Sequence, residues 1–222
     1  ITTKPVPAVQ PGTNLRFLAV GTGRMLDQSD INNTQGQRFF SILDGTNAAF
    51  SQDGTITGKP STLPAGVTFP IKLAQLAART SLNTQVLLDL RSQLGWYFDL
   101  GLGAGGSGWR VLNDPTTFYG SVAFATTSPA TTDACSPGGT SRVYNLDLGS
   151  GYCALNSTDG TCYASNFTGI VTDIRFISRN VNGEGRLGLV VGTSTGQLPT
   201  PQLKPSQSIG GKRLNTREII VN

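Results

Sequence analysis

The sequence predicts an all-β protein built from small antiparallel sheets that repeat along the chain. Three strand endings resemble one another: Leu18-Ala-Val-Gly-Thr22, Val122-Ala-Phe-Ala-Thr126 and Leu189-Val-Val-Gly-Thr193. A second apolar pattern follows the first two copies at the same offset, as Phe39-Phe-Ser-Ile42 and Val143-Tyr-Asn-Leu146. Strand pairs that recur at a fixed spacing indicate a radially repeated sheet, so we expect part of a β-propeller with antiparallel four-stranded blades.

Length and composition agree with an incomplete ring. The chain has 222 residues, with 28 glycines and 12 prolines between short apolar runs, whereas one blade uses about 40 to 50 residues. We therefore expect residues 1–222 to form one propeller segment of a larger ring. The first residue is Ile1 and not Met, which favours a fragment or the C-terminal part of a longer protein.

The elements of the first half follow from apolar runs and turn residues. Strands are expected at 14–22, 37–43 and 95–100, separated by a polar loop at 27–36 and a polar insertion at 45–66. A glycine-rich tip follows at 101–108. Between 69 and 90, Leu73, Leu76 and Ala77 recur at helix-like spacing, which predicts a short helix, with a strand pair as the alternative.

The second half predicts further strands at 109–112, 120–126, 142–148, 170–177 and 186–193. A Pro-rich tail covers 195–207, and a last apolar strand at 217–221 is expected to pair within a blade. Because no run of 18 or more apolar residues occurs, the sequence predicts no transmembrane helix.

Five sequence blocks together resemble the C-terminal propeller of the PilY/PilC family of type IV pilus tip and biogenesis proteins. They lie in the family's order across nearly the whole chain. The first combines Gly21-Thr-Gly-Arg-Met-Leu26 with Ser29-Asp-Ile-Asn-Asn-Thr-Gln35 and Phe39-Phe40; the others are Gly95-Trp-Tyr-Phe-Asp-Leu100, Arg110-Val-Leu-Asn-Asp-Pro115, Cys135-Ser-Pro-Gly-Gly-Thr-Ser141 and Thr216-Arg-Glu-Ile219.

This resemblance implies an exported, non-enzymatic protein of the periplasm, outer membrane or cell surface that acts at the pilus tip. It implies support of pilus assembly, surface adhesion and twitching motility. The implied partners are minor pilins, the upstream part of the same propeller, and host or abiotic surfaces. The family's calcium loop, its N-terminal adhesive domain and the Arg-Gly-Asp triplet of some members have no match here, so no cofactor or receptor is carried over.

One loop carries oxygen-bearing side chains that could serve a hard cation. Asp27, Asp30, Asn32 and Asn33 lie within a few residues of one another, and carboxylate and amide oxygens suit calcium. The spacing does not match an EF-hand loop, and Asp and Asn commonly cap turns through hydrogen bonds to the backbone. Turn capping is the favoured interpretation, so no metal site is predicted.

The composition argues against several kinds of catalysis. The sequence has no histidine, which removes the usual general base of a Ser-His-Asp or Cys-His system. Asp99 and Asp114 could form an acid-base pair, but turn-forming aspartates, expected also at Asp44 and Asp147, are commoner. Gly21-Thr-Gly23 lacks the further glycine and the helix of a phosphate loop, so a turn at a blade edge explains it better.

The three cysteines favour an oxidising compartment. Cys153 and Cys162 bracket a polar loop with an Asp-Gly turn, so a disulfide between them would staple a hairpin. Cys135 is left unassigned: it pairs outside the chain, competes for one of the other two, or stays free. Three cysteines without histidine are too few for a structural zinc site, which needs four ligands.

Basic and aromatic residues each admit two interpretations. The net charge is +4, and the basic residues near the C-terminus could bind anionic surfaces or DNA, although protection of a strand edge is favoured; they are Lys204, Lys212, Arg213 and Arg217. Trp96, Tyr97, Phe98 and Trp109 could stack on sugars, but alternating aromatics in strands more often fill the core.

Two classes of function remain open on these grounds. The leading one is a non-enzymatic module for adhesion and assembly at the pilus tip. The rival is an exported propeller enzyme or ligand binder, such as a quinoprotein-like dehydrogenase, although the sequence lacks the tryptophan-docking repeat and vicinal cysteine pair typical of such enzymes.

Overall fold

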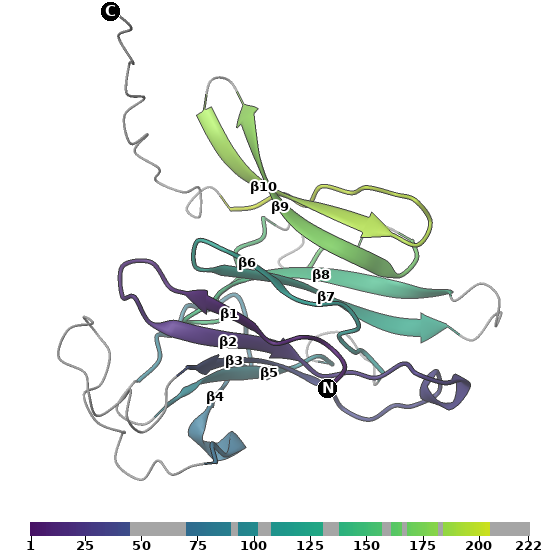
Figure 1. Cartoon of the computed structure of the whole chain (residues 1–222), viewed down its shortest axis with the longest axis horizontal. Coiled ribbons are helices and arrows are strands. Elements are labelled where there is room, and N and C mark those ends of the chain that lie inside the picture. Colours follow the sequence, from purple (N-terminus) through teal and green to yellow (C-terminus); the bar gives the residue numbers. More distant parts are fainter. Residues whose placement is uncertain are drawn as a thin grey trace, which may run out of the picture.

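Antiparallel strands make up nearly all of the regular structure in the computed structural model (Figure 1). Within the described residues there is no α-helix, only two 3-10 turns, Gln28–Asp30 and Leu73–Gln75. The predicted all-β class is therefore confirmed. The structure describes residues 1–44, 70–89, 93–101, 108–130, 138–156, 161–165, 168–181 and 184–204; the side chains of 179–181 and 184–186 are also outside the description.

The first sheet contains a four-stranded antiparallel meander, of which the sequence predicted three strands. Its strands are β1 (Val6–Val9), β2 (Arg16–Gly21), β3 (Arg38–Leu43) and β5 (Gly95–Asp99), and the two-residue β4 (Ala77–Ala78) adds in parallel to β5. Side chains of β3 alternate between buried and half-buried positions, as a strand with one core face requires.

The second sheet runs β6 (Thr116–Phe118), β7 (Ser121–Ala130) and β8 (Gly138–Asp147). Isolated bridges continue along β8, joining Leu146 to Cys153 and Val143 to Ala164. The third sheet is the hairpin of β9 (Val171–Val181) and β10 (Glu184–Thr193). In Figure 1 the three sheets lie one above another, as neighbouring blades would.

Aromatic side chains fill the space between the first two sheets. The rings of Phe39 and Phe124 stack 3.7 Å apart, and Phe124 stacks in turn on Tyr144 at 5.1 Å. The Trp96 indole N–H donates a 2.9 Å hydrogen bond to the Leu148 carbonyl oxygen, which also accepts one from the Ser41 hydroxyl. These contacts join the first two sheets through one buried aromatic core.

The first strand of each sheet is an edge strand. Among the described residues, β1 pairs only with β2, β6 only with β7, and β9 only with β10. β6 packs beside both β1 and β9, so these three edges lie next to one another. A radial arrangement of sheets has this property, because equivalent strands face the same side.

Two predicted elements are wrong. The helix expected within 69–90 is only the turn Leu73–Gln75, after which Leu76 is extended and Ala77 pairs with Trp96. The expected strand pair is also not found there, since β4 is the one strand in the described part of this segment. The strand expected at 109–112 is a single bridge between Arg110 and Thr127. The insertion at 45–66, most of the tip at 101–108 and the strand at 217–221 lie outside the described residues.

Candidate functional site

A polar groove runs between the second and third sheets. It encloses about 460 Å³ and is lined on one wall by 112–116 and on the other by 172–175 of β9. We call it the β6–β9 groove. Its volume lies in the range of ligand-binding clefts.

Charged groups on the groove walls already have partners within the chain. The Asp114 carboxylate accepts a 2.7 Å hydrogen bond from the backbone N–H of Lys4, which ties the entry of β1 to this wall. On the opposite wall, Arg175 pairs with Asp173 at 2.8 Å. Asn113 differs, because its amide nitrogen is shielded from solvent and has no acceptor among the described residues.

The acid-base pair of Asp99 and Asp114, the less favoured interpretation of the sequence, finds no support in these contacts. Asp99, at the end of β5, forms a 2.6 Å ion pair with Arg38 of the neighbouring strand, whereas Asp114 holds the Lys4 backbone. Asp147 caps a turn by accepting bonds from the backbone N–H and hydroxyl of Ser150. Asp44 pairs with Arg16 at 3.5 Å. Each carboxylate thus has a structural role.

The oxygen-rich loop at 27–36 is held by turn capping, the interpretation favoured from sequence. Asp27 begins the 3-10 turn and Asp30 completes a capping box with it. The Asp30 carboxylate is buried, bonds the Leu26 N–H at 2.8 Å and pairs with Arg24 at 2.7 Å. The Leu26 N–H and the Arg24 guanidinium together lower the pKa of Asp30 below its ordinary value. The Asn33 side chain accepts from the Gln35 N–H.

Arg110 fastens this loop to the second sheet, a role that the sequence did not reveal. Its guanidinium is buried and donates to four carbonyl oxygens at distances of 2.5 to 3.1 Å. The acceptors are those of Gly108, Arg24, Asp30 and Asn33. Arginine suits this role because its planar group presents five donors in a fixed fork.

The Gly21-Thr-Gly23 segment is a packing junction. A Cβ on Gly21 would lie within 2.4 Å of the Val111 side chain, and one on Gly23 within 2.5 Å of the Val111 carbonyl oxygen. Their absence lets the Val111 N–H reach the Thr22 carbonyl oxygen at 3.0 Å. The glycines therefore allow 110–111 to lie against the end of β2, and no helix follows them.

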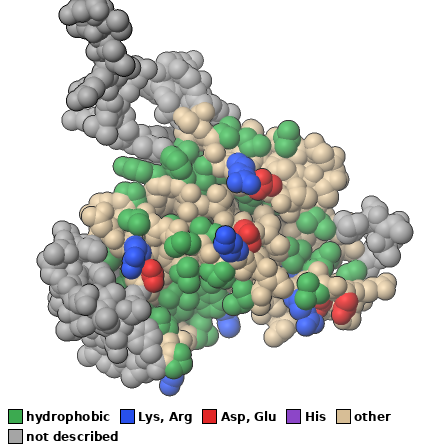
Figure 2. Space-filling view, viewed as in Figure 1, with side chains coloured by type: hydrophobic (Ala, Val, Ile, Leu, Met, Phe, Trp, Pro, Cys, Tyr) green, Lys and Arg blue, Asp and Glu red, His purple; other side chains and the backbone are tan. Residues whose placement is uncertain are grey.

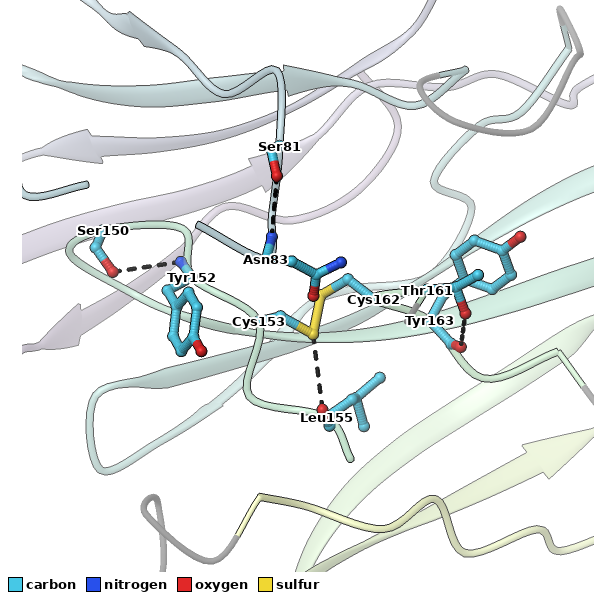
Figure 3. Close-up of a disulfide and its surroundings, with 9 residues drawn as sticks. All are labelled: Ser81, Asn83, Ser150, Tyr152, Cys153, Leu155, Thr161, Cys162 and Tyr163. Atoms are coloured by element: carbon cyan, nitrogen blue, oxygen red, sulfur yellow. Dashed lines mark hydrogen bonds between the residues drawn. A yellow bond between two sulfur atoms is a disulfide. The ribbon is translucent and has the colours of Figure 1, made fainter. Parts of the chain in front are cut away.

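The disulfide joins Cys153 to Cys162, with Cα atoms 5.6 Å apart (Figure 3). Both cysteines are buried. The Leu82 carbonyl oxygen accepts a 2.7 Å bond from the Cys153 N–H, so the bridge lies where the chain of the first sheet meets the edge of β8. Cys135 lies outside the described residues.

The aromatic residues put forward as a sugar platform belong mainly to the core. Trp96 and Phe98 are almost fully buried, and Trp109 is buried beneath the guanidinium of Arg142 at 3.7 Å. Tyr97 is half-buried, with Arg38 over its ring. Burial likewise raises the pKa of the Tyr144 hydroxyl above its ordinary value.

Of the four basic residues near the C-terminus, only Lys204 is among the described residues. Lys204 lies over the Tyr152 ring at 4.6 Å, and the other three residues lie outside the described part of the chain. On the face in Figure 2, basic side chains lie beside acidic ones, with hydrophobic groups between them. This face therefore does not form a single basic patch.

Neither a metal cluster nor a membrane-spanning helix occurs in the part of the chain that the structure describes. These residues contain no group of three or more His, Cys, Asp or Glu placed to hold a metal ion. They also contain no helix with the length and hydrophobicity needed to cross a membrane.

Comparison with solved structures relates the fold to the C-terminal domain of Pseudomonas aeruginosa PilY1. The match has a TM-score of 0.56 at 15% identity and covers 92% of this chain. The chain spans 45% of the length of that structure. No family model and no curated protein matches the sequence. The similarity therefore establishes a shared fold.

Proposed function

We propose that this chain is a non-enzymatic binding module at the tip of a type IV pilus. In this role it supports pilus assembly, surface adhesion and twitching motility by holding minor pilins and the rest of its own propeller. The observation that carries the proposal is the fold shared with the PilY1 C-terminal domain over 92% of the chain. The five sequence blocks of the PilY/PilC type support the same assignment.

Features of the described residues agree with a role in binding. The groove carboxylates and the strand-end aspartates hold backbone groups or arginines, and such contacts stabilise turns and sheets. The Cys153–Cys162 disulfide suits an exported protein, because disulfides persist in oxidising compartments. We place the chain at the periplasm, outer membrane or cell surface.

Deletion of the coding segment in its piliated host tests the proposal. We expect fewer surface pili by electron microscopy, weaker attachment to abiotic surfaces and reduced twitching zones. Complementation with the wild-type segment should restore all three. Complementation with Arg16→Ala, which removes an exposed ion pair away from the β6–β9 groove, is a matched control for expression and should also restore them.

The rival dehydrogenase is tested on purified protein. We expect no absorbance change and no dye reduction when pyrroloquinoline quinone, calcium and an alcohol are added. Normal piliation and motility after deletion, or stoichiometric quinone binding with turnover, would overturn the assignment.

A further inference from the structure

The chain that follows β10 first runs back along the outer edge of that strand. The Val191 N–H donates to the Pro199 carbonyl oxygen at 3.0 Å, and the Thr193 N–H donates to the Gln197 carbonyl oxygen at 3.1 Å. We call residues 197–204 the strap. Because of these two hydrogen bonds, the beginning of the strap is fixed to the third sheet.

The end of the strap pairs with the second sheet. It lies antiparallel to 154–156, with Leu155 and Leu203 as bridge partners, and a backbone hydrogen bond of 2.9 Å lies on either side of them. These bonds run from the Asn156 N–H to the Gln202 carbonyl oxygen and from the Lys204 N–H to the Ala154 carbonyl oxygen. The strap therefore joins the third sheet to the second.

The segment on which the strap docks belongs to the buried part of the second sheet. The Ala154 N–H donates to the Asn145 carbonyl oxygen of β8 at 2.8 Å, and Leu155 is only 2% exposed. The same segment begins at the disulfide between Cys153 and Cys162. The strap thus docks on backbone that is fixed to the core.

The two sheets that the strap joins differ in burial. Every residue from 121 to 127 of β7 and from 141 to 146 of β8 is buried, so both faces of the second sheet are covered. In β9, Ile174 is buried, whereas Asp173 and Arg175 are exposed. The third sheet is therefore covered on one face, and Figure 1 shows it at one end of the stack of sheets.

The third sheet depends on its docking to the second sheet. It has two strands, and an isolated two-stranded hairpin is at best marginally stable in water. At the entry of β9, the Ser141 hydroxyl of β8 donates to the Gly169 carbonyl oxygen at 3.0 Å and accepts from the Val171 N–H at 3.2 Å. The strap provides the second attachment, after the exit of β10.

We propose that the strap is a latch for the third sheet. In this device β9 and β10 open as one unit while the first two sheets stay folded, and undocking of the strap from 154–156 controls how often they open. Proteins open in such units, and those that bury few apolar contacts open at the lowest free energy. The proposal does not depend on the pilus assignment.

The experiment is amide hydrogen exchange of the full 222-residue chain, followed by mass spectrometry at a series of low urea concentrations. We expect peptides from β9 and β10 to share one free energy of opening and one dependence on urea. We expect that free energy to lie below the value for peptides from β7 and β8, because the second sheet is buried on both faces.

Two leucines of the strap provide matched variants. Leu203 is partly buried and packs against the core, whereas Leu198 is 69% exposed. Leu203→Ser should speed exchange in β9 and β10 at least tenfold and leave exchange in β7 and β8 unchanged. Leu198→Ser should exchange as the wild type does.

A second pair of variants tests the backbone contact of the strap. Lys204→Pro removes the N–H that donates to the Ala154 carbonyl oxygen, and it should also speed exchange in β9 and β10 at least tenfold. Lys204→Ala keeps this N–H and loses the contact with the Tyr152 ring. It should exchange more slowly in β9 and β10 than Lys204→Pro does.

Three results would overturn the proposal. The first is one common free energy of opening for β7 to β10 in the wild type. The second is equal exchange in β9 and β10 of Leu203→Ser and Leu198→Ser. The third is that Leu203→Ser or Lys204→Pro unfolds the whole chain or speeds exchange equally in all sheets, because the sheets would then open together and not one by one.

Discussion

The Arg110 guanidinium donates a 2.5 Å hydrogen bond to the backbone carbonyl oxygen of Asp30, eighty residues away in the sequence. The same Asp30 binds Arg24 and the Leu26 N–H through its carboxylate. Arg110, which is bridged to Thr127 of β7, thus holds the loop between β2 and β3, whose own turn is capped by an aspartate. The conformation of this loop therefore depends on the Arg110 guanidinium and on the Asp30 carboxylate.

Arg110→Met should destabilise the protein. The variant leaves four carbonyl oxygens without their charged donor, and hydrogen bonds to charged groups contribute about 1.5 to 3 kcal/mol each. Because partial relaxation and water will satisfy some acceptors, we expect a loss of about 2 to 4 kcal/mol in urea unfolding. As a control, Arg175→Met removes an exposed ion pair and should change stability by less than about 1 kcal/mol. Equal effects of the two variants would contradict this role of Arg110.

The lowered pKa of Asp30 predicts a dependence of stability on pH. Since the folded pKa lies below the ordinary value of 3.8, folding favours the charged carboxylate. The contribution is fully present above that ordinary value and is lost as the pH falls through the lower folded pKa. We expect Asp30→Asn to show a smaller decline in stability below about pH 4 than the wild type, measured by urea titration at each pH. Parallel curves for the two proteins would refute the prediction.

The sequence predicts the strands well where apolar alternation and turn residues coincide. β3, β5, β8 and β10 lie where apolar runs predict them. β1 and β6 were missed, because Pro7 and Pro115 interrupt or border their short sequences. The predicted helix at 69–90 failed because Leu76 and Ala77 are buried by the edge of β5 and not by a helix face.

The candidate site was less predictable, because its parts come together only in the fold. The groove joins 112–116 to 172–175, and no local pattern links these segments. Arg110 resembles any arginine near a strand until its four carbonyl acceptors are known. The Cys153–Cys162 disulfide could be proposed from the sequence, because two cysteines that bracket a short polar loop are close together along the chain.

The Cys153–Cys162 bridge should stabilise the protein mainly by restricting the unfolded chain. For a closed loop of this size we expect the double variant Cys153→Ser, Cys162→Ser to have a free energy of unfolding lower by about 2 to 3 kcal/mol. Cys135→Ser is the control and should leave the bridge intact. Non-reducing peptide mapping should recover a Cys153–Cys162 peptide pair, and recovery of Cys135 joined to either residue would disprove this pairing.

The stacked rings of Phe39 and Phe124 should couple the first two sheets. They lie 3.7 Å apart with an interplanar angle of 7°, and both are fully buried. A double-mutant cycle with Phe39→Leu and Phe124→Leu should give an interaction energy of about 0.5 to 1.5 kcal/mol. Phe40→Leu, on the other face of β3, is the matched control and should be additive with Phe124→Leu. Additivity of the Phe39 and Phe124 variants would show that the sheets pack without coupling through this pair.

The substitution Arg79→Met should stabilise the protein, whereas Arg110→Met should destabilise it. It is only 7% exposed, and its Nε and Nη2 atoms have no hydrogen-bond acceptor among the described residues. Burial lowers the pKa of its guanidinium, but arginine remains charged in proteins, so Nε and Nη2 are desolvated without a compensating hydrogen bond. Replacing buried charges by apolar side chains of similar volume often stabilises by about 1 to 4 kcal/mol. We therefore expect Arg79→Met to raise the free energy of unfolding, and Arg79→Lys, which keeps a buried charge, to give no gain. A loss of stability in Arg79→Met comparable to that in Arg110→Met would show that the Arg79 guanidinium has a stabilising partner.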